Sequence, residues 1–407
     1  MRPRRGGSPE PLPESPEQAA ETGTLAARIS LRQRSGGIVV PVLTAVLAFL
    51  IGGAIVAATG HNPLTAYNDI FDGAGLNWFA HPTTDTVQTS AYNLTQTLLQ
   101  TTSLILTGLA VAFAFRCGLF NIGGQGQYFV GLFVASWVGT SWVTMASGLH
   151  ILIAILAATG AGALWAGIAG FLKATVGAHE VITTIMLNWI AIWVGTYLFG
   201  DGGPLQGAEN KAGHVPISGD IAQGAKLPVF WGDKDLQGLH IGFFVALVAL
   251  VVFWLVLNRT TLGYEVKAVG FNPDAAAYGG ISVRKNVIRA MAISGAFAGL
   301  AGALDMLGYL YRVGVSDIPV SAVGFLGIAV ALLGRNTAVG VGLGAFLFGA
   351  LLFGTTHGLQ SGTIDPQLAS NLTYIIQGLI VLFVGADVLI LYLWNTRRRL
   401  GRRAARA

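Results

Sequence analysis

Charge is the scarcest ingredient of this sequence. Its 407 residues include 24 Lys and Arg and 19 Asp and Glu, which is 11% of the chain, whereas soluble domains carry roughly 25%. So few charged side chains cannot cover a globular surface, and a soluble enzyme is excluded. The rest of the composition, 53% hydrophobic with 56 glycines, predicts a polytopic membrane protein, because glycine is enriched where helices pack closely in lipid.

Two further absences narrow the function. Cysteine occurs once, at Cys117, which excludes an internal disulfide and a cysteine-rich metal site. The sequence Gly-x-x-x-x-Gly-Lys-Ser/Thr occurs nowhere, so the chain has no P-loop with which to bind ATP. Nucleophile, base and metal-ligand residues do not cluster at helical spacing, which disfavours an intramembrane enzyme. We therefore expect no catalytic residue, no metal and no cofactor.

Stretches without charge delimit the candidate membrane spans. A helix needs about 20 apolar residues to cross the bilayer, and a charge buried there is costly. Ten spans are predicted on this basis, at about residues 38–58, 94–115, 127–146, 150–172, 181–200, 240–258, 290–310, 320–334, 338–356 and 371–394. The predicted fold class is all-α, a polytopic membrane protein of about ten transmembrane helices with a re-entrant or broken segment.

The distribution of basic residues orients these spans. An even number of spans places both termini on one side of the membrane. With both termini cytoplasmic, only Lys211, Lys226, Lys234 and Arg312 of the 24 basic residues lie outside. The positive-inside rule therefore predicts a multi-pass protein of the plasma membrane with both ends in the cytoplasm. The net charge of +5 follows from this topology and requires no nucleic-acid partner.

Composition also divides the chain. Residues 1–34 are rich in Pro, Glu, Ser, Gly and Arg, and they predict a disordered cytoplasmic tail. The transmembrane domain is expected at 35–396, followed by a basic cytoplasmic tail at 397–407. Within the domain, the polar stretch 201–239 is predicted to be an extracytoplasmic loop, and the polar stretch 259–289 is predicted to be cytoplasmic.

Glycines and amides alternate in the stretch Gly118–Gln127, within a region otherwise free of charge. Irregular backbone at membrane depth is tolerated only where protein or a watery cavity satisfies it. We interpret this stretch as an unwound or re-entrant segment that lines a pathway; the alternative is an ordinary cytoplasmic turn. A second glycine-interrupted stretch, Gly324–Asn336, is a faint echo of it in the other half. Such pairs indicate a site near the middle of the membrane, but this echo alone does not establish one. The candidate pathway residues in the first stretch are Asn121, Gln125 and Gln127.

A second polar feature lies on one predicted helix. Glu180, Thr184 and Asn188 recur at intervals of four residues and so share one helical face. Polar residues in a membrane helix indicate a functional site by default, and neutral amides suit an uncharged solute. Trp189 and Phe325 are the predicted stacking surfaces. The alternative is that Glu180 closes the helix end while Asn188 ties two helices together.

One acidic residue, Asp305, is expected deep in the seventh span, where it should face the protein interior. If Asp305 and Glu180 relayed protons or cations, the chain would be an ion-coupled secondary transporter. That alternative remains open. Asp387, near the Arg-rich inner end, is interpreted as a packing residue.

The polar stretch 259–289 contains a helix start. Asn272 is suited to cap a helix whose first residue is Pro273, and an alanine run follows. A short helix between glycines forms a compact knob, which we interpret as a docking segment.

Three long motifs follow one another in a recognisable order: Gly118–Gln127, Glu180–Asn188, and Leu262–Asn272 with Ala275–Ala276 and Gly280–Ile281. Together they closely resemble the permease subunits of bacterial ABC importers for nucleosides. This is the branch associated with basic-membrane-protein lipoproteins, within the larger group of sugar and branched-chain amino-acid permeases. The resemblance covers roughly residues 38–394.

The resemblance implies a fold similar to type II ABC importers and a place in the bacterial inner membrane. It implies three kinds of partner besides membrane lipids: a second permease subunit, expected to form a heterodimer, two ATP-binding subunits or a fused ATPase, and an extracytoplasmic substrate-binding lipoprotein. It also implies that the docking segment couples to the ATPase through Gly263, Glu265, Gly270, Asn272, Asp274, Ala276, Tyr278 and Gly279. A sugar or branched-chain amino-acid ABC permease is the alternative within this class.

Overall fold

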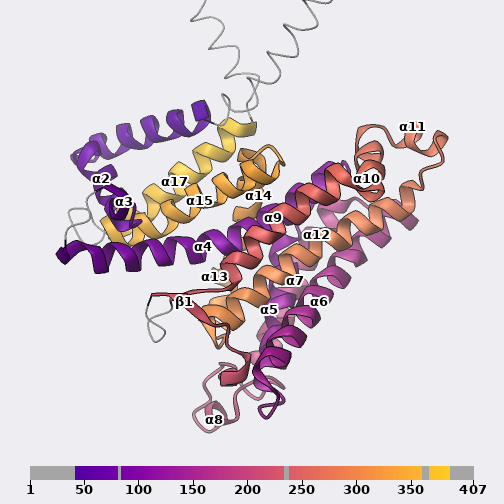
Figure 1. Ribbon diagram of the computed structural model, residues 1–407, viewed down its shortest axis with the longest axis horizontal. Helices are drawn as coiled ribbons and strands as arrows, with labels where there is room; N and C mark the ends of the chain where they lie inside the picture. The colour runs from indigo at the N-terminus through magenta and orange to yellow at the C-terminus, as the bar shows by residue number, and fades with distance from the viewer. Residues whose placement is uncertain (1–41, 81–83, 233–237, 360–365, 386–407) are drawn as a thin grey trace, which may run out of the picture. The chain divides into compact units, whose positions relative to one another are not determined.

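The computed structural model describes residues 42–80, 84–232, 238–359 and 366–385 (Figure 1). The chain divides into two units. In the first, residues 1–47 and 386–407, the described residues are 42–47, which are helical. The predicted tails and Asp387 lie outside the described residues. The second unit, residues 48–385, contains the features that follow.

Helices make up most of the second unit. In chain order the elements after the first helix, Val42–Ala58, are α2 (Pro63–Gly73), α3 (Asn77–Ala80), α4 (Thr84–Arg116), α5 (Gly124–Thr140), α6 (Ser147–Val176), α7 (Glu180–Phe199), α8 (Ala208–Lys211), η1 (Gln223–Ala225), β1 (Val229–Trp231), β2 (Leu239–His240), α9 (Gly242–Arg259), α10 (Thr261–Phe271), α11 (Pro273–Tyr278), α12 (Val283–Asp305), η2 (Met306–Leu310), α13 (Asp317–Val320), α14 (Val323–Leu333), α15 (Ala338–Gly354), η3 (Thr355–Leu359) and α17 (Pro366–Gly385). The strands β1 and β2 pair antiparallel. The π-helices η2 and η3 continue α12 and α15 directly.

The helices agree with a polytopic membrane protein. Within the described ranges, six are long and apolar enough to cross a membrane: α4, α6, α7, α9, α12 with η2, and α15 with η3. A seventh candidate is the pair Val42–Ala58 and Pro63–Gly73, which bends by 119° at its break. The remaining predicted spans correspond to the helices α5, α14 and α17. A helix therefore stands at each predicted position, which confirms the fold class, while the count of ten crossings stays a prediction.

Helix α4 is central to the packing. In its most apolar window 83% of the residues are buried, against 28% in α7 and in α9. It packs against α15, α14 and α12, and α12 packs in turn against α6 and α5. Helices α6 and α12 approach each other closely, because a Cβ atom on Gly162 would lie 2.7 Å from Cα of Gly299. Such small residues allow helix backbones to meet directly.

The two polar stretches lie at opposite ends of the bundle. Helices α10 and α11 lie at one end of α9 and α12, whereas α8 and β1 lie at the other end (Figure 1). The predicted topology likewise assigns residues 201–239 and 259–289 to opposite sides of the membrane. The predicted helix start is confirmed as well: Oδ1 of Asn272 accepts hydrogen bonds of 3.0 Å from the backbone N–H groups of Asp274 and Ala275, and Pro273 occupies the first turn.

Candidate functional site

The helical path is broken between α4 and α5. Residues 117–123 are not helical, although most of them are buried. Gly118 adopts a φ of 73°, in the left-handed region that favours glycine. The interruption predicted for this stretch is thus confirmed. Because buried backbone groups need hydrogen-bond partners, the side chains around the break are the first candidates for a site.

Asn121 fixes the centre of the break. Its Nδ2 donates to Oε1 of Gln127 at 2.9 Å and to Oγ of Ser294 at 2.7 Å. Its Oδ1 accepts from Nε2 of Gln127 at 3.0 Å and from the backbone N–H of Gly123 at 2.9 Å. Ser294 donates in turn to the carbonyl oxygen of Ala110 at 2.5 Å. One buried amide therefore connects α4, the break, α5 and α12.

Asn188 ties α7 to the same break. Its Oδ1 accepts from the backbone N–H of Gly126 at 2.8 Å, and its Nδ2 donates to the carbonyl oxygen of Ile122 at 2.9 Å. The side chain is buried. It satisfies backbone groups on both sides of the point where α5 begins.

Gln125 links the break to the start of α14. Its Oε1 accepts from the backbone N–H of Gly324 at 2.7 Å, and its Nε2 donates to the carbonyl oxygen of Ser321 at 2.9 Å. A Cβ atom on Gly124 would lie 3.4 Å from the carbonyl oxygen of Gly324. The two glycine-interrupted stretches that the sequence pairs as counterparts are therefore in contact.

The structure thus brings four of the predicted pathway residues into one buried amide cluster, comprising Asn121, Gln125, Gln127 and Asn188. Thr184 is buried beside it, and its hydroxyl donates to the carbonyl oxygens of Glu180 and Val181 in its own helix. In this state the hydrogen bonds of the cluster go to the chain itself. Ser294 belongs to the cluster too, and no spacing in the sequence signals it.

The other predicted pathway residues lie apart from this cluster. Glu180 forms an ion pair with Lys173 at the end of α6, with 2.9 Å between Oε2 and Nζ, as in the interpretation that Glu180 closes the helix end. Trp189 and Phe325 are exposed on the surface of the chain.

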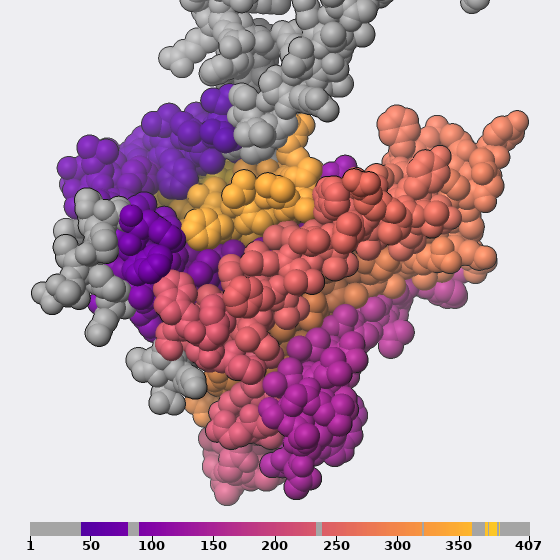
Figure 2. Space-filling model, in the orientation of Figure 1, coloured from indigo at the N-terminus to yellow at the C-terminus, as the bar shows by residue number. Residues whose placement is uncertain are grey.

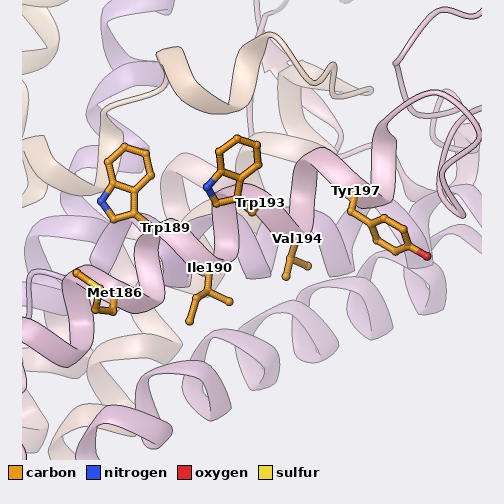
Figure 3. A pocket seen from close by; sticks show the side chains of 6 residues that line it. All are labelled: Met186, Trp189, Ile190, Trp193, Val194 and Tyr197. Carbon is orange, nitrogen blue, oxygen red and sulfur yellow. The ribbon is translucent and has the colours of Figure 1, made fainter.

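Trp189 belongs to an exposed aromatic face of α7 (Figure 3). Trp193 and Tyr197 follow it at intervals of four residues. The sequence-based prediction did not include these two, although the spacing of four from Trp189 signals them. The face borders a shallow cavity of about 470 Å³, lined by Met186, Trp189, Ile190, Trp193, Val194 and Tyr197.

Asp305 is buried at the end of α12, facing the protein interior as predicted. The hydroxyl of Ser103 donates to its Oδ1, and the hydroxyl of Tyr128 donates to its Oδ2 at 2.7 Å. This carboxyl group therefore joins α4, α5 and α12 immediately before the π-helix η2. No group of three His, Cys, Asp or Glu side chains that could hold a metal ion is found within the described ranges.

The predicted coupling residues occupy α10, α11 and their ends. Gly263 packs on the backbone of Val256 and Leu257 in α9. Gly270 packs on the backbone of Arg116 and Cys117, where α4 ends. Both positions leave no room for a side chain, so α10 lies directly on two membrane helices.

Glu265 connects α10 to α12. Its Oε2 accepts from Nδ2 of Asn286 at 3.0 Å and lies 3.8 Å from Nη1 of Arg289. Ala276 is buried, whereas Asn272, Asp274, Tyr278 and Gly279 are exposed. Phe271 and Tyr278 are 95% and 96% exposed, so two large rings project from the end of the bundle.

Comparison with known proteins agrees with these features. Residues 93–385 match the family described as "Branched-chain amino acid transport system / permease component". The chain is 39% identical to the guanosine ABC transporter permease protein NupP of Bacillus subtilis, over 91% of this chain and 99% of that protein. It is 33% identical to the nucleoside ABC transporter permease protein NupB of Lactococcus lactis, over 88% of this chain and 94% of that protein.

A third relative differs in the solute that its name gives. The glucose ABC transporter permease protein TsgB13 of Haloferax volcanii is 33% identical, over 84% of this chain and 86% of that protein. No solved structure matches the chain. The family match and the near full-length similarity to three ABC permeases together establish that this chain belongs to the family of permease components of branched-chain amino acid transport systems.

Proposed function

We propose that this chain is the permease subunit of an ATP-driven importer that carries nucleosides across the bacterial inner membrane by alternating access. The observation that carries the proposal is the similarity to a guanosine permease and a nucleoside permease over nearly the whole of each. Because the sequence has no P-loop, ATP is hydrolysed by separate subunits. A second permease subunit and an extracytoplasmic binding lipoprotein complete the complex.

The solute pathway is proposed to run past the broken segment. Its buried amides hold the segment in this state, and they exchange partners with the hydroxyls and base edges of the solute when the helices rearrange. The exposed rings of Trp189 and Phe325 offer stacking surfaces toward the second permease. Neutral donors and acceptors suit an uncharged solute, because no buried charge then needs a partner.

Helices α10 and α11 are proposed to dock on the ATPase. The exposed rings of Phe271 and Tyr278 form the contact, and α10 carries the movement inward. It lies on the end of α4 through Gly270 and on α12 through Glu265. A displacement of α10 therefore acts on α4 and α12, which both contact the broken segment. In this way, closure of the ATPase would favour one of the two states of the permease.

The proposal includes a cytoplasmic location for α10, α11 and both termini. The excess of basic residues on that side supports the orientation. Single cysteines introduced as Tyr278→Cys and His214→Cys test it, since both side chains are exposed at opposite ends and the native Cys117 is buried. An impermeant thiol reagent added to intact cells should label the variant at 214 and not the variant at 278.

Transport by the reconstituted complex tests the function itself. Proteoliposomes should accumulate labelled guanosine when ATP and the binding lipoprotein are supplied, and a protonophore should leave the uptake unchanged. Uptake that needs no ATP and follows an ion gradient would refute the proposal in favour of a secondary transporter.

A glucose permease is the second candidate, because TsgB13 matches the chain at 33% identity. Competition separates the two. An excess of unlabelled adenosine should reduce guanosine uptake, and an excess of glucose should not. Glucose uptake that nucleosides fail to inhibit would support this second candidate.

Co-purification of the ATPase tests the docking assignment. Asn272→Ala removes both cap bonds of α11, which is worth about 1 kcal/mol at a helix start, and should weaken the association. Asn272→Asp retains the accepting oxygen and serves as the matched control. Equal recovery of the ATPase with the Ala variant and with a Phe271→Ala, Tyr278→Ala double variant would show that another surface docks.

A further inference from the structure

A cavity of about 350 Å³ lies where the ends of α4, α9, α10 and α15 meet. Two cations, Arg116 and Lys267, line one part of it. Phe253, Trp254 and Leu257 line another part. The cavity therefore joins a positively charged wall to an apolar wall.

The positive charge in this cavity has no acidic counterpart. No Asp or Glu is among the lining residues. The ion pairs found in the described parts of the chain involve Lys173, His214 and Arg289 and neither of the two cavity cations. Arg116 donates from Nε and Nη2 to the neutral carbonyl oxygen of Asn336, at 3.0 and 2.6 Å.

Lys267 is similarly placed. Its Nζ lies 3.5 Å from Oδ1 of Asn258, which is another neutral oxygen. Two formal positive charges thus share a partly enclosed space without neutralisation. A site of this kind attracts an anion, because low-dielectric walls strengthen the field.

The first turn of α15 adds to this field. Thr337 caps the helix, and its Oγ1 accepts from the backbone N–H of Gly340 at 3.2 Å. Ala338 and Val339 line the cavity, and N–H groups in a first helical turn have no acceptor within their helix. The positive end of the helix dipole therefore lies at the same wall as the two cations.

The apolar wall continues onto the flank that would face lipid. Trp254 and Leu255 on α9, and Val339 and Leu343 on α15, are exposed. The α9 and α10 surface lies beside the α15 surface in the space-filling view (Figure 2). An occupant of the cavity thus has charged partners at one end and an apolar surface leading into the bilayer at the other.

We propose that this cavity binds an anionic phospholipid. The headgroup phosphate lies between Arg116, Lys267 and the first turn of α15, and an acyl chain follows Trp254 and Leu257. Basic pockets between membrane helices suit such headgroups. A free phosphate ion would use the charged wall and leave the apolar wall empty, so the amphipathic lining favours the lipid.

The bound lipid would connect α10 to the membrane helices. Lys267 belongs to α10, whereas the other headgroup partners belong to α4 and α15. The lipid therefore links α10, through the charge of Lys267, to the ends of α4 and α15.

Native mass spectrometry of the full-length chain in detergent tests the proposal, with phosphatidylglycerol and phosphatidylcholine as probes. Phosphatidylglycerol should bind more tightly, and Lys267→Gln should weaken its binding about fivefold, the effect of one cationic side chain near a membrane surface. Lys285→Gln is the matched control, since Lys285 is exposed in the same polar stretch and does not line the cavity. It should leave binding unchanged.

Other results would overturn the proposal. Equal binding of the two lipids would mean that the charged wall selects no headgroup. Equal losses in Lys267→Gln and Lys285→Gln would mean that general surface charge attracts the lipid. Displacement of phosphatidylglycerol by millimolar inorganic phosphate at constant ionic strength would identify a free anion as the occupant.

Discussion

Asn188 accepts the backbone N–H of Gly126 at 2.8 Å, so a side chain in the middle of α7 caps the first turn of α5. The residue that precedes α5, Gly123, has no side chain for this purpose. Helix starts ordinarily receive such a bond from their own N-cap residue. Here the cap comes from another helix, and the start of α5 depends on the position of α7.

The first prediction concerns this cap. Asn188→Ala leaves the N–H of Gly126 and the carbonyl oxygen of Ile122 without their partner, and each unsatisfied buried group costs about 1–3 kcal/mol. We expect a lower thermal stability of the purified chain and reduced uptake. Thr183→Ala is the control, because Thr183 is only half-buried and its hydroxyl donates to the carbonyl oxygen of His179 just before α7, away from the break. Wild-type stability and transport in Asn188→Ala would contradict the capping role.

The second prediction concerns the contact of α10 with the end of α4. A Cβ atom on Gly270 would overlap the backbone of Arg116, so Gly270→Ala forces the two elements apart. We expect transport to fall more than ATP hydrolysis, because the movement is no longer transmitted. Gly167→Ala in α6 is the comparison, since no atom lies within 4 Å of the added Cβ. Similar uptake by the two variants would rule out transmission through this contact.

The third prediction concerns Asp305. Asp305→Asn keeps the shape of the side chain and one accepting oxygen, and its amide group can donate to either hydroxyl. We expect ATP-dependent uptake to persist, whereas Asp305→Ala should destabilise the chain by about 1–3 kcal/mol through the unpaired hydroxyls of Ser103 and Tyr128. Complete loss of uptake in a stably folded Asp305→Asn variant would point instead to proton or cation relay.

The fourth prediction is a pH dependence of stability. His240 precedes α9, and its Nδ1 accepts from the N–H of Gly242 at 3.1 Å, which requires a neutral ring. Burial lowers the pKa of His240 to about 4, whereas an unfolded histidine has a pKa of about 6.5. The unfolded chain therefore takes up a proton first as the pH falls. The contribution of His240 to stability is complete above pH 6.5 and is lost progressively toward pH 4.

Between pH 7.5 and pH 5 this contribution should fall by about 2 kcal/mol. Thermal unfolding of the purified chain at the two pH values measures it. His240→Gln retains an accepting oxygen and does not titrate, so its unfolding should depend less on pH. An equally steep dependence in His240→Gln would assign the effect to other groups.

The features that the sequence predicts well are local. A gap in charge marks a helix, a run of glycines and amides marks the break after α4, and Asn272 with Pro273 marks the start of α11. Each of these follows from a few neighbouring residues. The contact between the two glycine-interrupted stretches, through Gln125 and Gly324, was not predicted, because similar composition shows that two stretches are alike and does not show that they touch.

The partners of individual polar side chains could not be predicted in this way. Ser103 and Tyr128 reach Asp305 across 202 and 177 positions of sequence, and no spacing rule connects such residues. The surroundings of Trp189 and Phe325, which are exposed, could not be predicted either. The spacing of residues shows which helical face a side chain lies on, but it does not show what packs against that face. The number of membrane spans is also difficult to predict from sequence. Helix α14 has 11 residues, fewer than a helix needs to cross the bilayer.

The backbone contact between α6 and α12 has a mechanical consequence. Where Gly162 meets Gly295 and Gly299, the two backbones are in direct contact, and no flexible side chain lies between them at these positions to absorb sliding. We therefore expect the pair to stay fixed during transport, and the pathway to open and close through movement of the two interrupted stretches and of α7. A crosslink between α6 and α12 would leave the cycle running, whereas a crosslink between α7 and α14 would stop it.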